Sequence, residues 1–183
     1  MIANTTTQKN RLAKGAQIRA NASRADIRVL ADNIRSVHNI GSIFRTAETL
    51  GISHIYCAGT TPTPVDRFGQ PRPDFSKVSL GAEHTLAWSH AVRASAIVRK
   101  LKKEGFLIIA LEQGIGSVDY KKAAKEISSA MHTLVIVGNE VDGVAPSLVK
   151  SADILAEIPM RGAKESLNVS VATGIALFRW FDR

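Results

Sequence analysis

Three polar clusters contain the side chains that could bind and orient a ligand. Asn39 and Arg45 lie six residues apart at the start of a periodic apolar segment, and the planar guanidinium of an arginine suits a phosphate or a carboxylate. Gly138-Asn139-Glu140 follows an apolar run, where glycine allows backbone groups to approach a ligand closely. Ser166-Leu167-Asn168 comes directly before an apolar C-terminal segment. The clusters therefore indicate a ligand site shared by distant parts of the chain.

Each cluster also has a purely structural interpretation. Arg45 could form a surface ion pair with Glu48 or Glu104, which would contribute little. The glycine-rich cluster could be a tight turn before a short helix, or an acidic calcium loop, although the EF-hand pattern is absent. The third cluster could simply cap the last helix. These alternatives remain open at the level of residue types alone.

The elements that would position the clusters alternate between strands and helices. Apolar runs predict strands at 27–31, 54–58, 86–88, 106–111, 133–137 and 153–158. Apolar periodicity predicts helices from Asn39 to Leu50, at 91–104, at 145–150 and after 168, with a weak helix at 120–129 and a helical turn at 77–81. Asn39 is the expected N-cap of the first helix, and Gly51 its C-terminal stop. This order predicts a parallel α/β sheet, with ligands at the carboxyl ends of its strands.

The composition predicts one soluble domain. A chain of 183 residues with 45% apolar residues can bury a sizeable core, and no apolar run reaches the length of a membrane span. Cys57 is the only cysteine, so the chain can form neither an internal disulfide nor a cysteine-based zinc site. The five histidines lack ligand spacing, and we expect no metal. A reducing, cytoplasmic location fits this cysteine usage.

The charge favours a polyanionic partner. There are 24 Lys and Arg residues against 16 Asp and Glu residues, a net charge of +8. Nucleic acid is the first interpretation and an anionic membrane surface the second. Residues 1–25 form a basic arm without acidic residues, ahead of a domain at 26–183. The arm could bind RNA, act as an organellar transit peptide, or be a solvated tail. The candidate RNA contacts are Arg11, Arg19 and Arg24 in the arm, Arg45, and Arg67 and Arg72 in a proline-rich loop at 59–74.

Two further patterns bear on binding and assembly. Gly114-Ile115-Gly116 follows a strand as a dinucleotide fingerprint would, but the third glycine position is Asp119 and no strong helix follows. We therefore reject a dinucleotide site. The C-terminal helix is apolar around most of its circumference, which indicates a subunit interface.

Taken together, three blocks of this chain resemble the SpoU (TrmH) family of RNA ribose 2′-O-methyltransferases in the SPOUT superfamily. The blocks are Asn39-Ile40-Gly41-Ser42-Ile43-Phe44-Arg45-Thr46-Ala47 with Gly51, Gly138-Asn139-Glu140 with Gly143, and Ile158-Pro159-Met160 through Glu165-Ser166-Leu167-Asn168-Val169-Ser170. Their order and spacing agree with the family, and the likeness covers residues 27–182.

The resemblance implies a three-layer α/β fold with a parallel sheet and a deep C-terminal trefoil knot, and a homodimer packed through the knot and the last helix. It implies S-adenosylmethionine as methyl donor, held by three loops. The corresponding donor-binding residues are Leu111, Glu112, Gly138, Ile158, Met160, Leu167 and Asn168. The residues at the family's catalytic and RNA-facing positions are Asn39, Arg45, Glu140, Ser166 and Asn168.

The expected function is therefore methylation of a ribose 2′-hydroxyl in a structured tRNA or rRNA. Arg45 is a poor base because an arginine stays protonated, so we expect it to stabilise the developing alkoxide or to clamp a neighbouring phosphate. A phosphate oxygen or Glu140 would then accept the proton. Two alternatives are an inactive RNA-binding protein with the same fold and a SPOUT enzyme that methylates a base.

Overall fold

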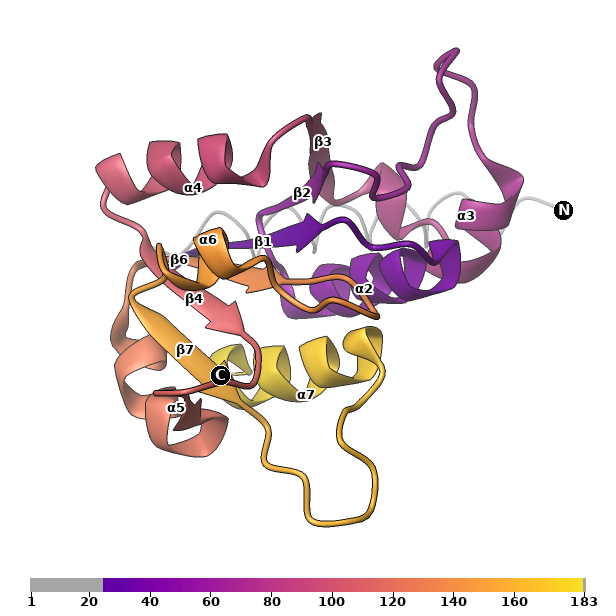
Figure 1. Cartoon of the computed structure of the whole chain (residues 1–183). Coiled ribbons are helices and arrows are strands. Elements are labelled where there is room, and N and C mark those ends of the chain that lie inside the picture. Colours follow the sequence, from indigo (N-terminus) through magenta and orange to yellow (C-terminus); the bar gives the residue numbers. More distant parts are fainter. Residues whose placement is uncertain (1–24, 183) are drawn as a thin grey trace, which may run out of the picture.

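The structure is a computed structural model that describes residues 25–182. Within this range, seven strands form one sheet in the order β3-β2-β1-β6-β4-β7-β5, and every neighbouring pair is parallel (Figure 1). The strands are β1 Asp26–Asp32, β2 His54–Ala58, β3 Ala87–Ala91, β4 Leu107–Leu111, β5 Val118–Asp119, β6 His132–Val137 and β7 Ile154–Glu157. The helices are α2 Val37–Leu50, α3 Pro73–Ser79, α4 Ala94–Lys103, α5 Tyr120–Ser129, α6 Pro146–Val149 and α7 Val169–Phe181, with a 3₁₀ turn at Ala82–His84.

Helices cover both faces of the sheet. Helices α2, α5 and α7 lie on one face, and α4 and α6 lie on the other (Figure 1). Each face has its own apolar core: Val29, Phe44 and Trp180 are buried on the first, and Leu30, Leu101 and Ile136 on the second. This confirms the predicted α/β sheet of parallel strands between layers of helices.

The strand order brings three loops together. The chain builds β1, β2 and β3 outward in one direction, then places β4 beyond the position that β6 later fills, and inserts β7 between β4 and β5. The carboxyl ends of β4, β6 and β7 therefore lie side by side. Such a change of direction is where open parallel sheets bind ligands.

Helix α2 begins earlier than predicted. Its N-cap is Ser36, whose hydroxyl accepts a hydrogen bond from the backbone N–H of Asn39, so the predicted cap at Asn39 is wrong. Ser36 is a good cap in its own right, and the helix extends to include Val37. Asn39 therefore lies within the first turn, with its side chain free for other contacts. Gly51 ends the helix in the left-handed conformation, as predicted.

Three boundaries differ from the sequence prediction for local reasons. A helical turn was expected at 77–81, but helix α3 starts earlier, at Pro73, and ends at Ser79. It starts there because proline suits the first helical position. Strand β3 runs to Ala91 because all five of its residues pair with β2, and α4 consequently starts at Ala94 rather than Ala91. Strand β5 lies within a predicted loop and pairs with β7 through two residues only. No helix in residues 25–182 combines the length and apolar character needed to cross a membrane.

Candidate functional site

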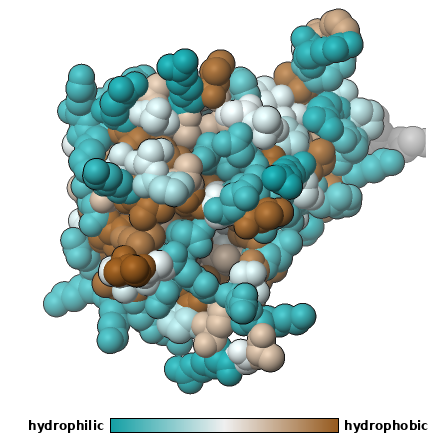
Figure 2. All heavy atoms as spheres, in the orientation of Figure 1, coloured by the Kyte–Doolittle hydropathy of each residue, from teal (hydrophilic) through white to brown (hydrophobic). Residues whose placement is uncertain are grey.

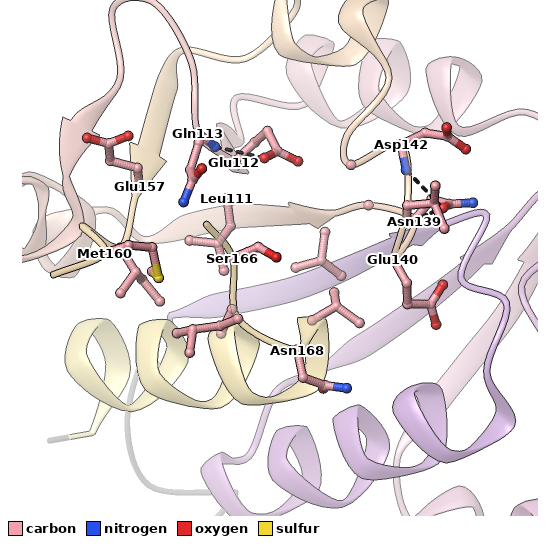
Figure 3. Close-up of a pocket in the computed structure, with 18 residues that line it drawn as sticks. Leu111, Glu112, Gln113, Asn139, Glu140, Asp142, Glu157, Met160, Ser166 and Asn168 are labelled. Carbon is pink, nitrogen blue, oxygen red and sulfur yellow. Dashed lines mark hydrogen bonds between the residues drawn. The ribbon is translucent and has the colours of Figure 1, made fainter. Parts of the chain in front are cut away.

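A cavity of about 490 Å³ lies at the carboxyl ends of β4, β6 and β7, beside the start of α7 (Figure 3). Side chains from these three strand ends and from the segment before α7 surround one common space (Figure 3). Its lining includes every residue that was predicted to bind the donor: Leu111, Glu112, Gly138, Ile158, Met160, Leu167 and Asn168. Glu140 and Ser166 line the same cavity.

Gly138 occupies a position that only glycine can fill. A Cβ atom there would lie 2.2 Å from the carbonyl carbon and oxygen of Gly143, which is backbone that cannot turn away. The reason is a tight loop in which Asn139 and Gly143 exchange two backbone hydrogen bonds of 3.0 Å. Asn139 closes the loop by accepting hydrogen bonds from the N–H groups of Val141 and Asp142. The cluster is thus both the tight turn and a wall of the cavity.

Glu112 braces this loop from the end of β4. One of its carboxylate oxygens accepts a hydrogen bond of 2.8 Å from the N–H of Val144, and the other accepts one of 2.8 Å from the N–H of Gln113. Gln113 in turn donates to the carbonyl oxygen of Glu165, 2.9 Å away in the third loop. The three loops around the cavity are therefore joined by direct hydrogen bonds.

A second network joins the cavity to the first turn of α2. Asn39 is 9% exposed and donates through Nδ2 to Glu140 Oε1 at 2.8 Å. Its Oδ1 accepts a hydrogen bond of 3.0 Å from Asn168 Nδ2. Because an amide donates and accepts at once, Asn39 connects the second and third predicted clusters. Residues separated by more than a hundred positions are thus held in one chain of contacts.

The Glu140 carboxylate accepts three hydrogen bonds. Besides Asn39, the N–H of Arg35 donates at 2.8 Å and the N–H of Ser36 at 3.0 Å. Burial alone would raise the pKa of Glu140, but these three donors outweigh it and hold the pKa below its ordinary value. A carboxylate stabilised in this way, at the N-terminus of α2, is a weak proton acceptor.

Asn168 has two roles that the sequence left as alternatives. Its Oδ1 caps α7 by accepting hydrogen bonds from the N–H of Ser170 at 2.9 Å and from that of Val171 at 3.4 Å. Its Nδ2 simultaneously makes the contact with Asn39. The cap fixes the start of α7, and Val169 and Ala172 of that helix also line the cavity.

Arg45 lies apart from this assembly. It is exposed on α2, it does not line the cavity, and among residues 25–182 it forms no ion pair, including the suggested pairs with Glu48 and Glu104. Its neighbour Thr46 faces Gly174 of α7. Arg45 is therefore available to a ligand or a second protomer approaching α2 and α7.

The candidate RNA contacts are divided. Arg67 and Arg72 line a second cavity under the loop between β2 and α3. Arg72 is already paired with Asp74 at 2.7 Å, whereas Arg67 stacks on the ring of Phe68. Arg11, Arg19 and Arg24 lie outside the described residues. In the described part of the chain, no three His, Cys, Asp or Glu side chains are arranged to hold a metal ion.

Sequence reasoning missed the residues that act through tertiary contacts. Asn139 was noted only as part of its cluster, yet its Nδ2 also donates to the carbonyl oxygen of Asn33 at the end of β1. Gln113 and the backbone of Arg35 and Ser36 were not singled out. The available signal was Ser36 itself, a cap residue directly before the helix.

Comparison with known proteins identifies the family of the chain. Residues 26–178 match the model of the SpoU rRNA Methylase family, and the chain belongs to that family. It is 33% identical over 157 residues to a tRNA (guanosine(18)-2′-O)-methyltransferase of Aquifex aeolicus, covering 84% of this chain and 67% of that protein. It is 30% identical over 150 residues to the 23S rRNA (guanosine-2′-O-)-methyltransferase RlmB of Coxiella burnetii, covering 82% of this chain and 56% of the relative.

Solved structures agree with the fold. The A. aeolicus TrmH/SpoU tRNA modifying enzyme superposes with a TM-score of 0.78 at 28% identity, covering 95% of this chain and 82% of that one. An AdoMet-bound rRNA methyltransferase from Sinorhizobium meliloti gives a TM-score of 0.75 at 29% identity, covering 85% of this chain and 56% of that one. The chain thus spans little more than half the length of the rRNA enzymes that it matches. The predicted family is confirmed.

Proposed function

We propose that this protein uses S-adenosylmethionine to methylate a ribose 2′-hydroxyl of a structured tRNA or rRNA. The observation that carries the proposal is the three-loop cavity with the Glu140–Asn39–Asn168 network at its edge. The relatives named above are tRNA and rRNA guanosine 2′-O-methyltransferases, which favours ribose over base as the acceptor and an enzyme over an inactive binding protein.

The cavity suits the proposed donor. Its volume lies within the range of roughly 300–1,000 Å³ that holds molecules of this size. Gly138 allows close approach to backbone, Leu111 and Ile158 supply apolar surface, and Glu112 and Glu157 place carboxylates around a ligand that carries positive charge. S-adenosylmethionine, when bound, supplies a methyl group on a sulfonium sulfur.

The residues of the chain would contribute mainly by positioning. Methyl transfer needs the ribose oxygen aligned with the methyl carbon, so a rigid site provides much of the rate. Glu140 already accepts hydrogen bonds from three donors, and we assign it to holding Asn39 and the start of α2. The proton of the 2′-hydroxyl would then pass to a phosphate oxygen of the RNA. Ser166 lines the cavity and is assigned to the ribose or the donor.

Arg45 is proposed to stabilise the developing alkoxide or to hold the adjacent phosphate. Arg45→Lys keeps the charge but loses the planar fork. We expect the variant to bind S-adenosylmethionine normally and to methylate at least tenfold more slowly, because losing one hydrogen bond that stabilises the transition state has an effect of at least this size. Single-turnover methylation with saturating donor measures this rate, and a wild-type rate would exclude the clamp.

A homodimer would bring Arg45 of one protomer toward the cavity of the other. Its support is an exposed apolar stripe on α7, formed by Val171, Ile175 and Phe178, beside the helix that carries Arg45. We also propose the C-terminal trefoil knot of the SPOUT fold, in which the segment leading to α7 passes through the loop after β4. The hydrogen bond between Gln113 and Glu165 supports this placement. A crystal structure of the dimer would test both.

RNA would be bound by Arg45, by the loop that carries Arg67 and Arg72, and by the arm that carries Arg11, Arg19 and Arg24. The net charge of +8 supports this assignment. We place the protein in the cytoplasm, where its RNA substrate and methyl donor occur together.

The test is chemical identification of the product. The protein is incubated with S-adenosylmethionine carrying a labelled methyl group and with tRNA and rRNA, which are then digested to nucleosides for mass spectrometry. The expected product is one 2′-O-methylnucleoside. A methyl group on a base, or donor binding without transfer to any RNA, would refute the proposal.

A further inference from the structure

The second cavity is lined by side chains of a kind that stack on nucleobases. It has a volume of about 690 Å³ and lies between strand β3 and the loop that joins β2 to α3. Trp88 and His90 form its floor, on the same face of β3. The loop supplies Arg67, Phe68 and Arg72. None of these residues lines the methyl-transfer cavity.

One wall of this cavity is formed by a short protruding loop, residues 65–71, which we call the finger. Val65 and Pro71 form an antiparallel bridge at its base, and the carboxylate of Asp66 accepts hydrogen bonds of 2.8 and 2.9 Å from the N–H groups of Phe68 and Gln70. The loop between β2 and α3 stands away from the body in the ribbon and in the space-filling view (Figures 1 and 2). These contacts within the loop stabilise its conformation.

The finger presents an aromatic ring to solvent. Phe68 is 72% exposed, and the guanidinium carbon of Arg67 lies 4.7 Å from the centre of its ring. An aromatic ring that is held in place at a loop tip and backed by a cation is a stacking surface for a base. The half-buried indole of Trp88 offers a second ring in the same cavity.

The charges in the cavity argue against a simple phosphate site. Arg72 donates two hydrogen bonds to Asp74, at 2.7 and 3.2 Å, so most of its charge is already compensated. Asp66 adds a carboxylate to the lining. Only Arg67 among the lining arginines lacks an ion pair within the described residues. The cavity is therefore better suited to stacking on an aromatic base than to binding a phosphate by charge.

The segment of residues 33–36 connects residues that line the second cavity to residues that line the methyl-transfer cavity. The backbone of this segment donates hydrogen bonds toward each cavity. On one side, the N–H of Ile34 donates to Thr61 Oγ1, which lines the second cavity. On the other, the N–H groups of Arg35 and Ser36 donate to Glu140. Both cavities thus lie at the carboxyl edge of the sheet, where an RNA strand with its target ribose at the first cavity would extend toward the second.

From these observations we propose that the finger cavity binds one unpaired nucleobase of the RNA substrate, close to the methylated nucleotide. This rests on the proposed function. The base stacks on Phe68 and Trp88, and Arg67 contributes charge and stacking. Single-stranded bases in loops and bulges are the parts of RNA that proteins read in this way. A peptide adding to β3, which is the edge strand, is the competing occupant.

The experiment compares two short single-stranded oligonucleotides of equal length, one with bases and one abasic, by fluorescence anisotropy with the full-length protein. Both present the same phosphates, so a difference in affinity reports contacts with the bases, and the Phe68 variant tests stacking. We expect the oligonucleotide with bases to bind several-fold tighter, and Phe68→Ala to remove this difference, a loss of roughly five- to tenfold. Phe68 is exposed, so the variant should fold. Met131→Ala, an exposed apolar residue at the opposite end of the sheet, is the matched control.

Two further measurements separate this proposal from the enzyme assignment. S-adenosylmethionine affinity, measured by calorimetry, should be unchanged in Phe68→Ala, while the KM for RNA rises and kcat with saturating RNA stays near wild type. Equal binding of the two oligonucleotides, or unchanged binding by Phe68→Ala, would overturn the base site even if methylation occurs. Base-dependent binding that Phe68→Ala abolishes would support the site even if no RNA is methylated.

Discussion

Replacing Glu140 by glutamine tests whether this residue holds the site together or accepts the proton. The change keeps the size of the side chain but leaves one acceptor oxygen in place of two. If the amide oxygen takes the Oε1 position, the bonds from Ser36 and Asn39 survive, and the N–H of Arg35 faces an NH₂ group.

The magnitude follows from these contacts. A hydrogen bond to a charged acceptor contributes about 1.5–3 kcal/mol when it is buried. Glu140 is partly exposed and water can replace its oxygen, so we expect Glu140→Gln to lower the free energy of unfolding by about 1–2 kcal/mol. For a domain of this size that is a fall in Tm of about 2–8 °C. Donor affinity should fall as well, because Asn39 and Asn168 lose their anchor.

The assay pairs thermal unfolding, followed by circular dichroism, with calorimetric titration of S-adenosylmethionine. Asp142→Asn is the matched control for thermal unfolding, since the Asp142 side chain lies on the same loop but forms only an exposed 3.4 Å pair with Arg35; its change in the free energy of unfolding should stay within about 0.5 kcal/mol. A Glu140→Gln protein with wild-type Tm and donor affinity but no methyl transfer would refute the positioning role and restore Glu140 as the base.

The pH dependence has a defined sign. The folded-state pKa of Glu140 is lower than its ordinary value of 4.5, so its contribution to stability is present above that value and is lost as the pH falls through the folded pKa. Wild type should therefore lose more stability on acidification below 4.5 than Glu140→Gln does. Parallel stability curves for the two proteins would contradict this linkage.

Three other substitutions test separate parts of the site. Gly138→Ala should abolish donor binding and lower the Tm because its Cβ meets backbone at 2.2 Å, whereas Gly162→Ala, with open space around it, should behave as wild type in calorimetry. Asn168→Ala removes the cap of α7 and should lower the free energy of unfolding in urea by about 1 kcal/mol. Asn168→Asp keeps the capping oxygen but loses the NH₂ group that donates a hydrogen bond to Asn39, so it should recover the stability but not the affinity for S-adenosylmethionine. Phe178→Glu should yield a monomer in size-exclusion chromatography with light scattering; an unchanged dimer would place the interface elsewhere.

Much of the fold could be predicted from local patterns. The apolar runs that became β1, β2, β4 and β6 are buried on both sides, and such continuous runs are typical of parallel strands. Strand β3 was placed less well because Ser89 and His90 are polar, and only pairing with β2 makes this edge segment a strand. The two-residue strand β5 depends in the same way on β7, which arrives much later in the chain.

The site could be predicted as a set of residues but not as a set of contacts. Gly138 was recognisable because a glycine directly after a buried strand indicates close backbone approach. Two of the three partners of Glu140 were not, because they are backbone groups about 105 positions earlier in the chain. The finger cavity was also missed, since its floor exists only when the register of β3 brings Trp88 and His90 under the loop.

The segment of residues 33–36, which is hydrogen-bonded to residues of both cavities, has a thermodynamic consequence. Its backbone donates to Thr61 at the finger cavity and to Glu140 at the proposed donor cavity, so the two proposed binding equilibria would share one segment. Any factor by which bound RNA changes the affinity for S-adenosylmethionine must equal the factor by which the donor changes the affinity for RNA. An enzyme built in this way can favour the productive ternary complex over either binary one without any movement of the sheet.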